Sequence, residues 1–270
     1  MCIRDSSKPL IGLLASEYPL VRVAAIQALE KQQPDGQWRG ELIHECYVPG
    51  GPFLMGENED AHPVHVNSFY ISKYPVTNTD YYRYAQDCEN PFTYPERKAR
   101  HPVVGVSWED AIKYAAWAGM RLLTEAEWEK AASWAPASGD VPTNSSLQDR
   151  LDGHKRRYPW GDSFDPSKSN TDASKIGTTT PVDQYSPAGD SPYGVADMAG
   201  NVWEWCSSLH RDYPYEANDG REDLQGPAPR VLRGGAFKYG ASEARCTARL
   251  RYLPTSRHSY FGFRLGCSSS

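Results

Sequence analysis

The chain has 270 residues, which is enough for one large domain or two small ones. Its net charge of −5 gives no electrostatic basis for binding nucleic acid or an anionic membrane surface, so we expect neither as a partner. No stretch approaches the roughly 20 apolar residues of a membrane span. The frequent glycine, proline, tyrosine and tryptophan are typical of a loop-rich fold held together by aromatic side chains.

The N-terminal end shows no apolar run of the kind found in a signal peptide. Residues 1–8 are interpreted as a sequence scar or a disordered end and are left out of the fold prediction. The six cysteines are scattered without a CxxC spacing, which gives no support for a tetrahedral zinc site. Without an export signal, we expect reduced thiols and a cytoplasmic location.

Residues 9–40 are predicted to form a separate helical unit followed by a linker. The apolar side chains after Pro19 recur at nearly helical spacing, at Leu20, Val23, Ala24, Ile26, Ala28 and Leu29. This segment resembles the second helix of a HEAT-type repeat, which cannot bury its own apolar face. It is either the stub of a longer helical array or a helix that docks on the main domain.

Residues 41–270 are predicted to form the main domain. Residues 47–56 have the pattern of a strand broken by a Pro-Gly-Gly turn, and residues 65–74 that of a second strand. Three helices are predicted where a Thr or Ser can cap the first turn, over residues 77–88, 107–118 and 124–134. Residues 135–155 have the composition of an exposed insertion. From Tyr158 onward, recurring turn residues predict short strands and structured loops.

The segment 194–206, GVADMAGNVWEWC, combines two glycines, two tryptophans and two carboxylates. On a strand, Trp203 and Trp205 point to one face and Glu204 to the other. Asp197 precedes Glu204 by seven residues, with a tight Ala-Gly-Asn turn between them. Two carboxylates and turn carbonyls form the type of ligand set that calcium requires. The alternative is a buried turn that the tryptophans anchor.

Eight phrases in a fixed order carry a family resemblance: GGPFLMG, KYPVTNTDYYRY, HPVVGVSWEDAIKYAAWAGMRLLTEAEWEKAA, YPWGD, TTPVDQY, YGVADMAGNVWEWC, RVLRGGAF and FGFRLG. Together they resemble the formylglycine-generating enzyme (sulfatase-modifying factor) superfamily. The resemblance implies an α+β fold of the C-type-lectin-like class. In that fold a few helices flank small antiparallel sheets, with much irregular chain between them.

The oxidase members of this superfamily carry a redox cysteine pair just after an Arg-Gly-Gly turn, where they bind copper and oxidise a substrate cysteine. Here the segment reads RGGAFKYGASEARC, with Tyr239 at the first cysteine position and Glu243–Ala244 at the second. A thiolate is both the copper ligand and the redox group, and these residues cannot replace it. We therefore expect no copper and no formylglycine formation. Cys246 resembles the structural cysteine of the family.

Residues 237–261 resemble the variable C-terminal region of diversity-generating retroelement target proteins, many of which use this fold. Aromatic and small hydroxyl side chains are mixed there without a period of 2 or 3.6, as in a paratope on a rigid frame. The expected ligand-binding residues are Phe237, Lys238, Tyr239, Glu243, Leu250, Tyr252, Leu253, Thr255, Ser256, His258, Ser259 and Tyr260. The alternative is an ordinary C-terminus without a dedicated binding surface.

The resemblance also implies a structural calcium site in the DMAGNVWEW phrase. Asp197 and Glu204 would bind through their carboxylates, and Gly200 and Val202 through their carbonyls. A second family site matches residues 170–171, but Ser174 stands where its acidic ligand belongs, so we expect no ion there. Calcium would neutralise the two carboxylates and lock the loop.

The expected function is non-catalytic binding of an unidentified protein or surface ligand, on a domain carried by a helical-repeat or signalling chain. One alternative is an oxidoreductase of the same family that acts on a protein cysteine or a small molecule. Another is an accessory interaction module of a larger signalling protein.

Overall fold

The structure is a computed structural model that describes residues 45–135 and 153–268. The predicted scar at residues 1–8, the helical stub and linker at residues 9–40, and the start of the main domain at residue 41 lie outside the described residues. Most of the predicted insertion at residues 135–155 does so too. Within the described part, no helix is long and apolar enough to cross a membrane.

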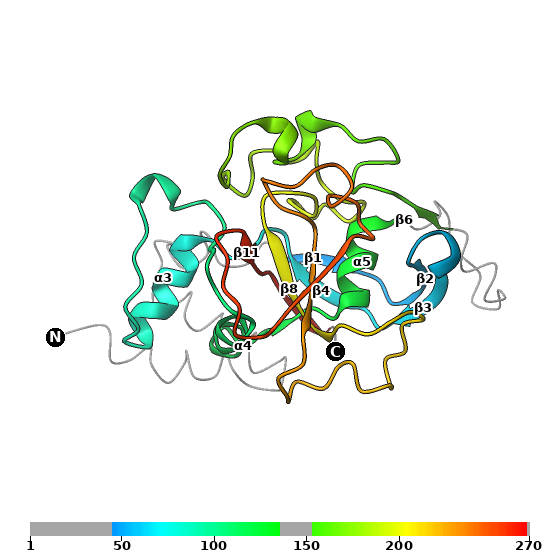
Figure 1. Cartoon of the computed structure of the whole chain (residues 1–270), viewed down its shortest axis with the longest axis horizontal. Helices are drawn as coiled ribbons and strands as arrows, with labels where there is room; N and C mark the ends of the chain where they lie inside the picture. The colour runs from blue at the N-terminus through cyan, green and yellow to red at the C-terminus, as the bar shows by residue number, and fades with distance from the viewer. Residues whose placement is uncertain (1–44, 136–152, 269–270) are drawn as a thin grey trace, which may run out of the picture.

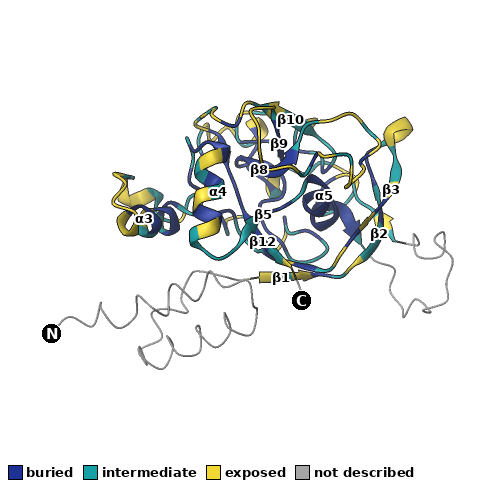
Figure 2. Cartoon of the chain, turned by 90° about the horizontal axis from the view of Figure 1, so that it is seen from below, coloured by how far each residue is buried: buried dark blue, intermediate teal, exposed yellow. Residues whose placement is uncertain are grey.

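The three predicted helices are confirmed, and each begins at the predicted cap. They are α3 (Asn78–Asp87), α4 (Trp108–Trp117) and α5 (Glu125–Ser133). In each case the hydroxyl of the capping residue accepts a hydrogen bond from the backbone N–H at the third helical position. The acidic side chain at that position accepts one from the backbone N–H of the capping residue. Figure 2 shows α4 buried on one side and exposed on the other, whereas α5 is buried throughout.

One four-stranded sheet joins the two ends of the domain. Its order is β1 (Glu45–Val48), β4 (Phe69–Ser72), β12 (Leu265–Ser268) and β5 (Arg121–Leu122). All neighbouring strands are antiparallel. The strand nearest the C-terminus therefore lies between two strands from the first half of the domain.

A hairpin of β2 (Gly51–Met55) and β3 (His62–Val66) stands beside this sheet. The Pro-Gly-Gly break after β1 is confirmed. The prediction of one strand over residues 65–74 is wrong, because the chain breaks at residues 67–68 between β3 and β4. The break between β1 and β2 lies opposite the break between β3 and β4, so β1 pairs with β4 while β2 pairs with β3. The buried positions change phase across the break, from Val64 and Val66 to Phe69 and Ile71, so one strand with a period of 2 does not fit them.

The second four-stranded sheet carries the segment predicted to bind ligand. Its order is β10 (Arg249–Tyr252), β9 (Arg230–Arg233), β8 (Trp203–Leu209) and β11 (Phe261–Gly262). The pairs are antiparallel except for β11, which runs parallel to β8 (Figure 1). Residues 253–260 therefore form a loop that crosses from one edge of the sheet to the other.

The remaining regular structure consists of short pieces. A two-residue pair joins β6 (Trp134–Ala135) to β7 (His154–Lys155). The single-turn 3-10 helices are η1 (Asn58–Asp60), η2 (Glu96–Lys98), η3 (Pro166–Lys168) and η4 (Asp172–Ser174). No α-helix occurs between residues 158 and 268. The loop-rich α+β architecture is thus confirmed.

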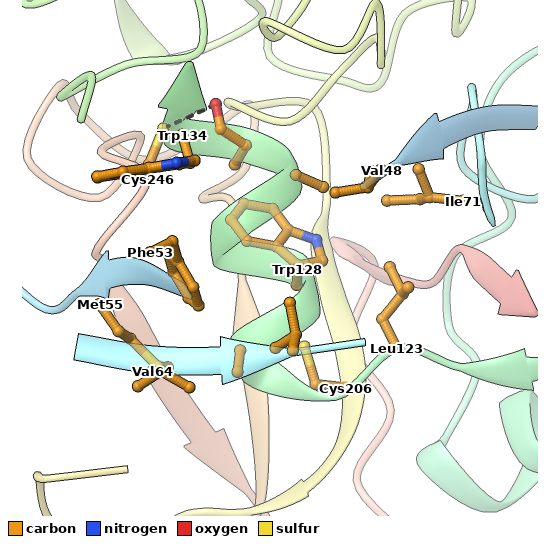
Figure 3. Close-up of a cluster of buried hydrophobic side chains, with 14 of the residues drawn as sticks. Val48, Phe53, Met55, Val64, Ile71, Leu123, Trp128, Trp134, Cys206 and Cys246 are labelled. Atoms are coloured by element: carbon orange, nitrogen blue, oxygen red, sulfur yellow. Dashed lines mark hydrogen bonds between the residues drawn. The ribbon is translucent and has the colours of Figure 1, made fainter. Parts of the chain in front are cut away.

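Two large hydrophobic clusters fill the interior of the described part. Trp128 on α5 lies at the centre of the first, among side chains from β1, β2, β3 and β4 (Figure 3). The second contains Trp203, Trp205 and Phe263 together with tyrosines of α3 and α4. Because Trp203 and Trp205 enter the same cluster, the predicted alternation on β8 is confirmed, and Glu204 points the other way.

Candidate functional site

The Arg233-Gly234-Gly235 turn connects β9 to the candidate binding segment. Its glycines have φ values of +98° and +76°, a region that L-residues with a side chain rarely adopt. A Cβ on Gly235 would lie 2.7 Å from the carbonyl oxygen of Glu243, which is closer than any side chain can approach. The turn therefore requires glycine on two independent grounds.

A buried ion network holds this turn in place from below. The guanidinium of Arg233, which is fully buried, donates to Glu129 and, at 3.4 Å, to Glu125 on α5. Arg249 of β10 donates to the same Glu125 at 2.6 Å, and Lys155 to Glu129 at 2.7 Å. Burial opposes ionisation of Glu129, but the charges of Arg233 and Lys155 outweigh it and hold its pKa below the usual value. The network fixes α5, β9 and β10 relative to one another.

An unbroken series of rings covers the sheet above this network. The ring of Tyr239 lies 5.8 Å from Trp203 and 5.6 Å from Tyr260, centre to centre. The series continues from Tyr260 to His258 at 5.1 Å and from His258 to Tyr252 at 5.0 Å. We call the upper side of this series, formed by Lys238, Tyr239, Tyr252, Leu253 and His258, the aromatic face.

The predicted ligand-binding residues differ in their exposure. Those that are exposed are Lys238, Leu253, Thr255 and Ser259, and those that are half-buried are Phe237, Tyr239, Glu243, Leu250, Tyr252, Ser256 and His258. Tyr260 was expected on the surface but is only 7% exposed. It is packed by its neighbours Phe261 and Tyr239, so it forms the floor of the aromatic face. Eleven of the twelve predicted residues thus reach solvent, on loops above a rigid frame.

Tyr239 stands where the family resemblance places the first oxidase cysteine. Burial and a hydrogen bond with Tyr260 raise its pKa, which keeps the phenol protonated. Cys246 lies in the first hydrophobic cluster, with its Sγ 3.6 Å from the carbonyl oxygen of Ala132 (Figure 3). Burial raises the pKa of this thiol well above its usual range, so it resists ionisation. Cys46, Cys88, Cys206 and Cys246 are free thiols.

The loop expected to hold calcium has its polar groups already engaged. Glu204 accepts two hydrogen bonds from Arg264, at 2.6 and 2.7 Å, and one from the indole of Trp128 at 2.8 Å. The carbonyl of Gly200 accepts the N–H of Val202 at 2.8 Å. The guanidinium thus supplies the positive charge that calcium would bring. Arranged in this way, these residues do not fit the predicted calcium site.

Asp197, the other expected calcium ligand, is held inside the protein by a single neighbour. Its Oδ2 accepts a 2.8 Å hydrogen bond from Asn201, and burial raises its pKa to about 7. At the second family site, Ser174 donates to Asn170 at 2.9 Å. Within residues 45–135 and 153–268, no group of three or more His, Cys, Asp or Glu side chains is placed to hold a metal ion. The function proposed below does not depend on calcium.

A groove of about 910 Å3 opens elsewhere on the described surface, and no residue of the aromatic face lines it. Its polar wall contains Glu222, which accepts hydrogen bonds from Ser207 and from the hydroxyl of Tyr215. Burial raises the pKa of Glu222. The hydroxyls of Ser207, Ser208 and Tyr215 all donate to this carboxylate, which explains how it is tolerated in the interior.

Comparison with known proteins identifies the family. Residues 30–267 match the model of the sulfatase-modifying factor enzyme 1-like domain. The serine/threonine-protein kinase pkn1 of Chlamydia caviae is 38% identical over 81% of this chain, but the chain spans only 37% of the length of that kinase. The formylglycine-generating enzyme of Thermomonospora curvata is 31% identical over 80% of this chain and 91% of the enzyme.

Among solved structures, variable protein 1 of Treponema denticola superimposes with a TM-score of 0.61. The superposition covers 83% of this chain and 95% of that protein, at 20% sequence identity. This likeness confirms the predicted fold class, and the family match spans almost the whole described region. The chain therefore belongs to the sulfatase-modifying factor enzyme 1-like, or formylglycine-generating enzyme-like, family.

Proposed function

We propose that the domain binds a ligand without catalysis and that the aromatic face is its binding surface. The observation that carries this proposal is the arrangement around Tyr239. At the position where the oxidases place a redox cysteine, this chain has a protonated phenol within a series of rings. Such a site can pack against a ligand and hydrogen-bond to it, but it cannot supply a thiolate to copper or to a disulfide.

The division between frame and surface supports a binding role. Arg233 and the two glycines that follow it are held by buried charges and by backbone geometry, and none of these contacts involves a residue of the aromatic face. Leu253, which follows Tyr252 in the chain, is 54% exposed although its side chain is large and apolar. Exposed aromatic and aliphatic side chains gathered in one patch are characteristic of recognition surfaces.

We further propose that the domain serves as an interaction module within a longer signalling protein. The chain matches only 37% to 43% of the length of the Chlamydia proteins named as serine/threonine kinases. In this arrangement the aromatic face would select the partner, and other parts of the longer protein would act on it. If the face is of the variable-protein type, substitutions among sibling sequences would be confined to residues 237–261.

The test is selection of random peptides displayed on phage against the immobilised domain. We expect enrichment on the native protein and none on a variant with Tyr252→Ala, Leu253→Ala and His258→Ala. Tyr260 is kept because it belongs to the floor. Thermal melting followed by circular dichroism provides the control, and the triple variant should melt near the native temperature. Equal enrichment on both proteins would overturn the proposal, and so would unfolding of the triple variant.

A further inference from the structure

A cation of the protein itself already occupies the aromatic face. The ammonium of Lys238 lies 3.6 Å from the ring centre of Tyr260 and 5.7 Å from that of Tyr239. Both distances are within the roughly 6 Å over which a ring attracts a cation. Lys238 is an exposed residue, so its side chain can leave the rings for solvent. The face thus contains a cation-binding position that a flexible side chain of the protein fills.

Two carboxylates lie beside Gly240, the residue that follows Tyr239. A Cβ built on Gly240 would lie 3.7 Å from a carboxylate oxygen of Glu243 and 3.9 Å from both carboxylate oxygens of Asp172, so the two side chains converge on one place. The backbone N–H of Asp172 donates to the carbonyl of Tyr239 at 3.0 Å, which ties Asp172 to the backbone of a ring residue. Within the described ranges neither carboxylate forms an ion pair, and Glu243 accepts a 2.7 Å hydrogen bond from the hydroxyl of Ser242.

From this geometry we infer that the ligand of the aromatic face is a protein segment with an arginine side chain, whose guanidinium displaces Lys238 from the rings. The inference rests on the binding role proposed above and adds the chemistry of the partner. A guanidinium stacks on Tyr239 and Tyr260 and at the same time presents its N–H groups to Asp172 and Glu243. An acidic partner would meet these two carboxylates and be repelled.

Lys238 then acts as an internal competitor that keeps the rings covered until a partner arrives. Its ammonium is a strongly hydrated point charge without the planar fork of a guanidinium, so it holds the site weakly. Removing this competitor should therefore tighten the binding of an arginine ligand, which is the opposite of what a direct contact residue would show. This sign distinguishes the present inference from a general binding role for the face.

The experiment is isothermal titration calorimetry at low ionic strength with a short arginine-containing peptide. The same peptide with citrulline in place of arginine is the control, because citrulline keeps the shape and loses the charge. We expect the domain to bind the arginine peptide and not the citrulline peptide. Lys238→Gln should bind about two- to fivefold tighter, the change that corresponds to one exposed cation–π contact. Asp172→Asn and Glu243→Gln should each weaken binding, whereas Glu109→Gln on the exposed side of α4 should leave it unchanged.

Equal binding of the citrulline peptide, or unchanged or weaker binding by Lys238→Gln, would overturn the inference. The phage selection described above separates this failure from failure of the proposed function. If selection enriches peptides on the face that have no excess of arginine, the binding role stands and the cationic ligand is wrong. If selection enriches nothing, both fail together. Melting curves of the substituted proteins show whether each variant is folded.

Discussion

Gly235 and Gly194 have nearly the same backbone angle but different surroundings. Their φ values are +76° and +77°, yet a Cβ on Gly194 would have no atom within 4 Å, whereas one on Gly235 would meet the carbonyl of Glu243 at 2.7 Å. The pair separates the two reasons why a turn needs glycine. One is the cost of the backbone angle itself, and the other is the lack of space.

We predict that Gly194→Ala lowers the free energy of unfolding by about 1–2 kcal/mol, the cost of the left-handed angle alone. Gly235→Ala should cost clearly more, because the backbone of residues 243–244 must also move. Urea denaturation measures both variants. Equal losses would show that the turn relaxes without resistance and that the rigid frame assumed beneath the aromatic face does not exist.

The arrangement of Glu204 leads to a prediction about calcium. Because Arg264 and Trp128 already use both carboxylate oxygens, we expect the melting temperature to be the same with calcium and with a chelator. A site occupied at 100 times its dissociation constant would add about 2.7 kcal/mol and shift the melting curve visibly. A shift of several degrees that disappears in Glu204→Ala would restore the calcium site that the family resemblance implies.

At the scale of elements, α5 supplies two buried carboxylates that bind arginines of β9 and β10. Glu125 and Glu129 lie four residues apart, and both are fully buried beneath the sheet that carries the binding loop. The sequence EAEWE contains this pair, but its spacing is also that of an ordinary solvated helix face. Trp128 between them is the signal that could have revealed their burial. If a helix is enclosed on all sides, the carboxylates beside its buried tryptophan need oppositely charged partners.

We predict that Glu129→Gln lowers the free energy of unfolding by about 3–5 kcal/mol at neutral pH, because Arg233 loses its buried partner. The folded-state pKa of Glu129 lies below 4.5, so its contribution is fully present above that pH and is lost as the pH falls through the lowered pKa. The difference between native and variant should therefore shrink in acid. Glu109→Gln, on the exposed side of α4, should change stability by less than about 1 kcal/mol at any pH. A gap that stays constant down to acid pH would contradict this role.

The sequence predicted helices better than strands for a physical reason. A helix start is encoded locally, and Thr77, Ser107 and Thr124 each form the capping box that their neighbours indicate. Strand pairing depends on residues far apart in the chain. The break between β3 and β4 follows from pairing with two different partners, β2 and β1, and its local trace is only the three-residue spacing between Val66 and Phe69.

The candidate site shows the same limit. Composition identified the loop between β10 and β11 as a surface, and most of its members reach solvent. It could not separate Tyr260 from Tyr252, because both rings pack against Phe261 and only Tyr260 is also covered by Tyr239 and Lys238. The family phrase likewise suggested that Glu204 binds an ion, whereas its partner, Arg264, lies sixty positions away in the chain.

At the scale of the whole molecule, membership of the family does not by itself determine the chemistry of the site. The chain is 31% identical to a formylglycine-generating enzyme over most of both proteins, yet Tyr239, which cannot form a thiolate, stands where the family resemblance places the first redox cysteine. A shared frame thus permits either an oxidase or a binding domain, and the site decides between them.

We predict that the protein, supplied with copper and oxygen, will not convert the cysteine of a sulfatase-type peptide to formylglycine. Peptide mass spectrometry provides the measurement, and a formylglycine-generating enzyme serves as the positive control. Cys246→Ser should make no difference, because that thiol is buried and resists ionisation. Product that forms with the native protein and disappears in Cys246→Ser would establish the oxidoreductase alternative.

The position of β12 has a consequence for synthesis on the ribosome. Its residues, Leu265–Ser268, pair with both β4 and β5, whose chain emerges far earlier. Until β12 leaves the exit tunnel, those two strands face each other across an open gap with unpaired backbone groups. The nascent domain is therefore expected to stay incomplete through most of translation and to close late. During that interval the binding loop, made just before β12, would be one of the last parts to reach its place.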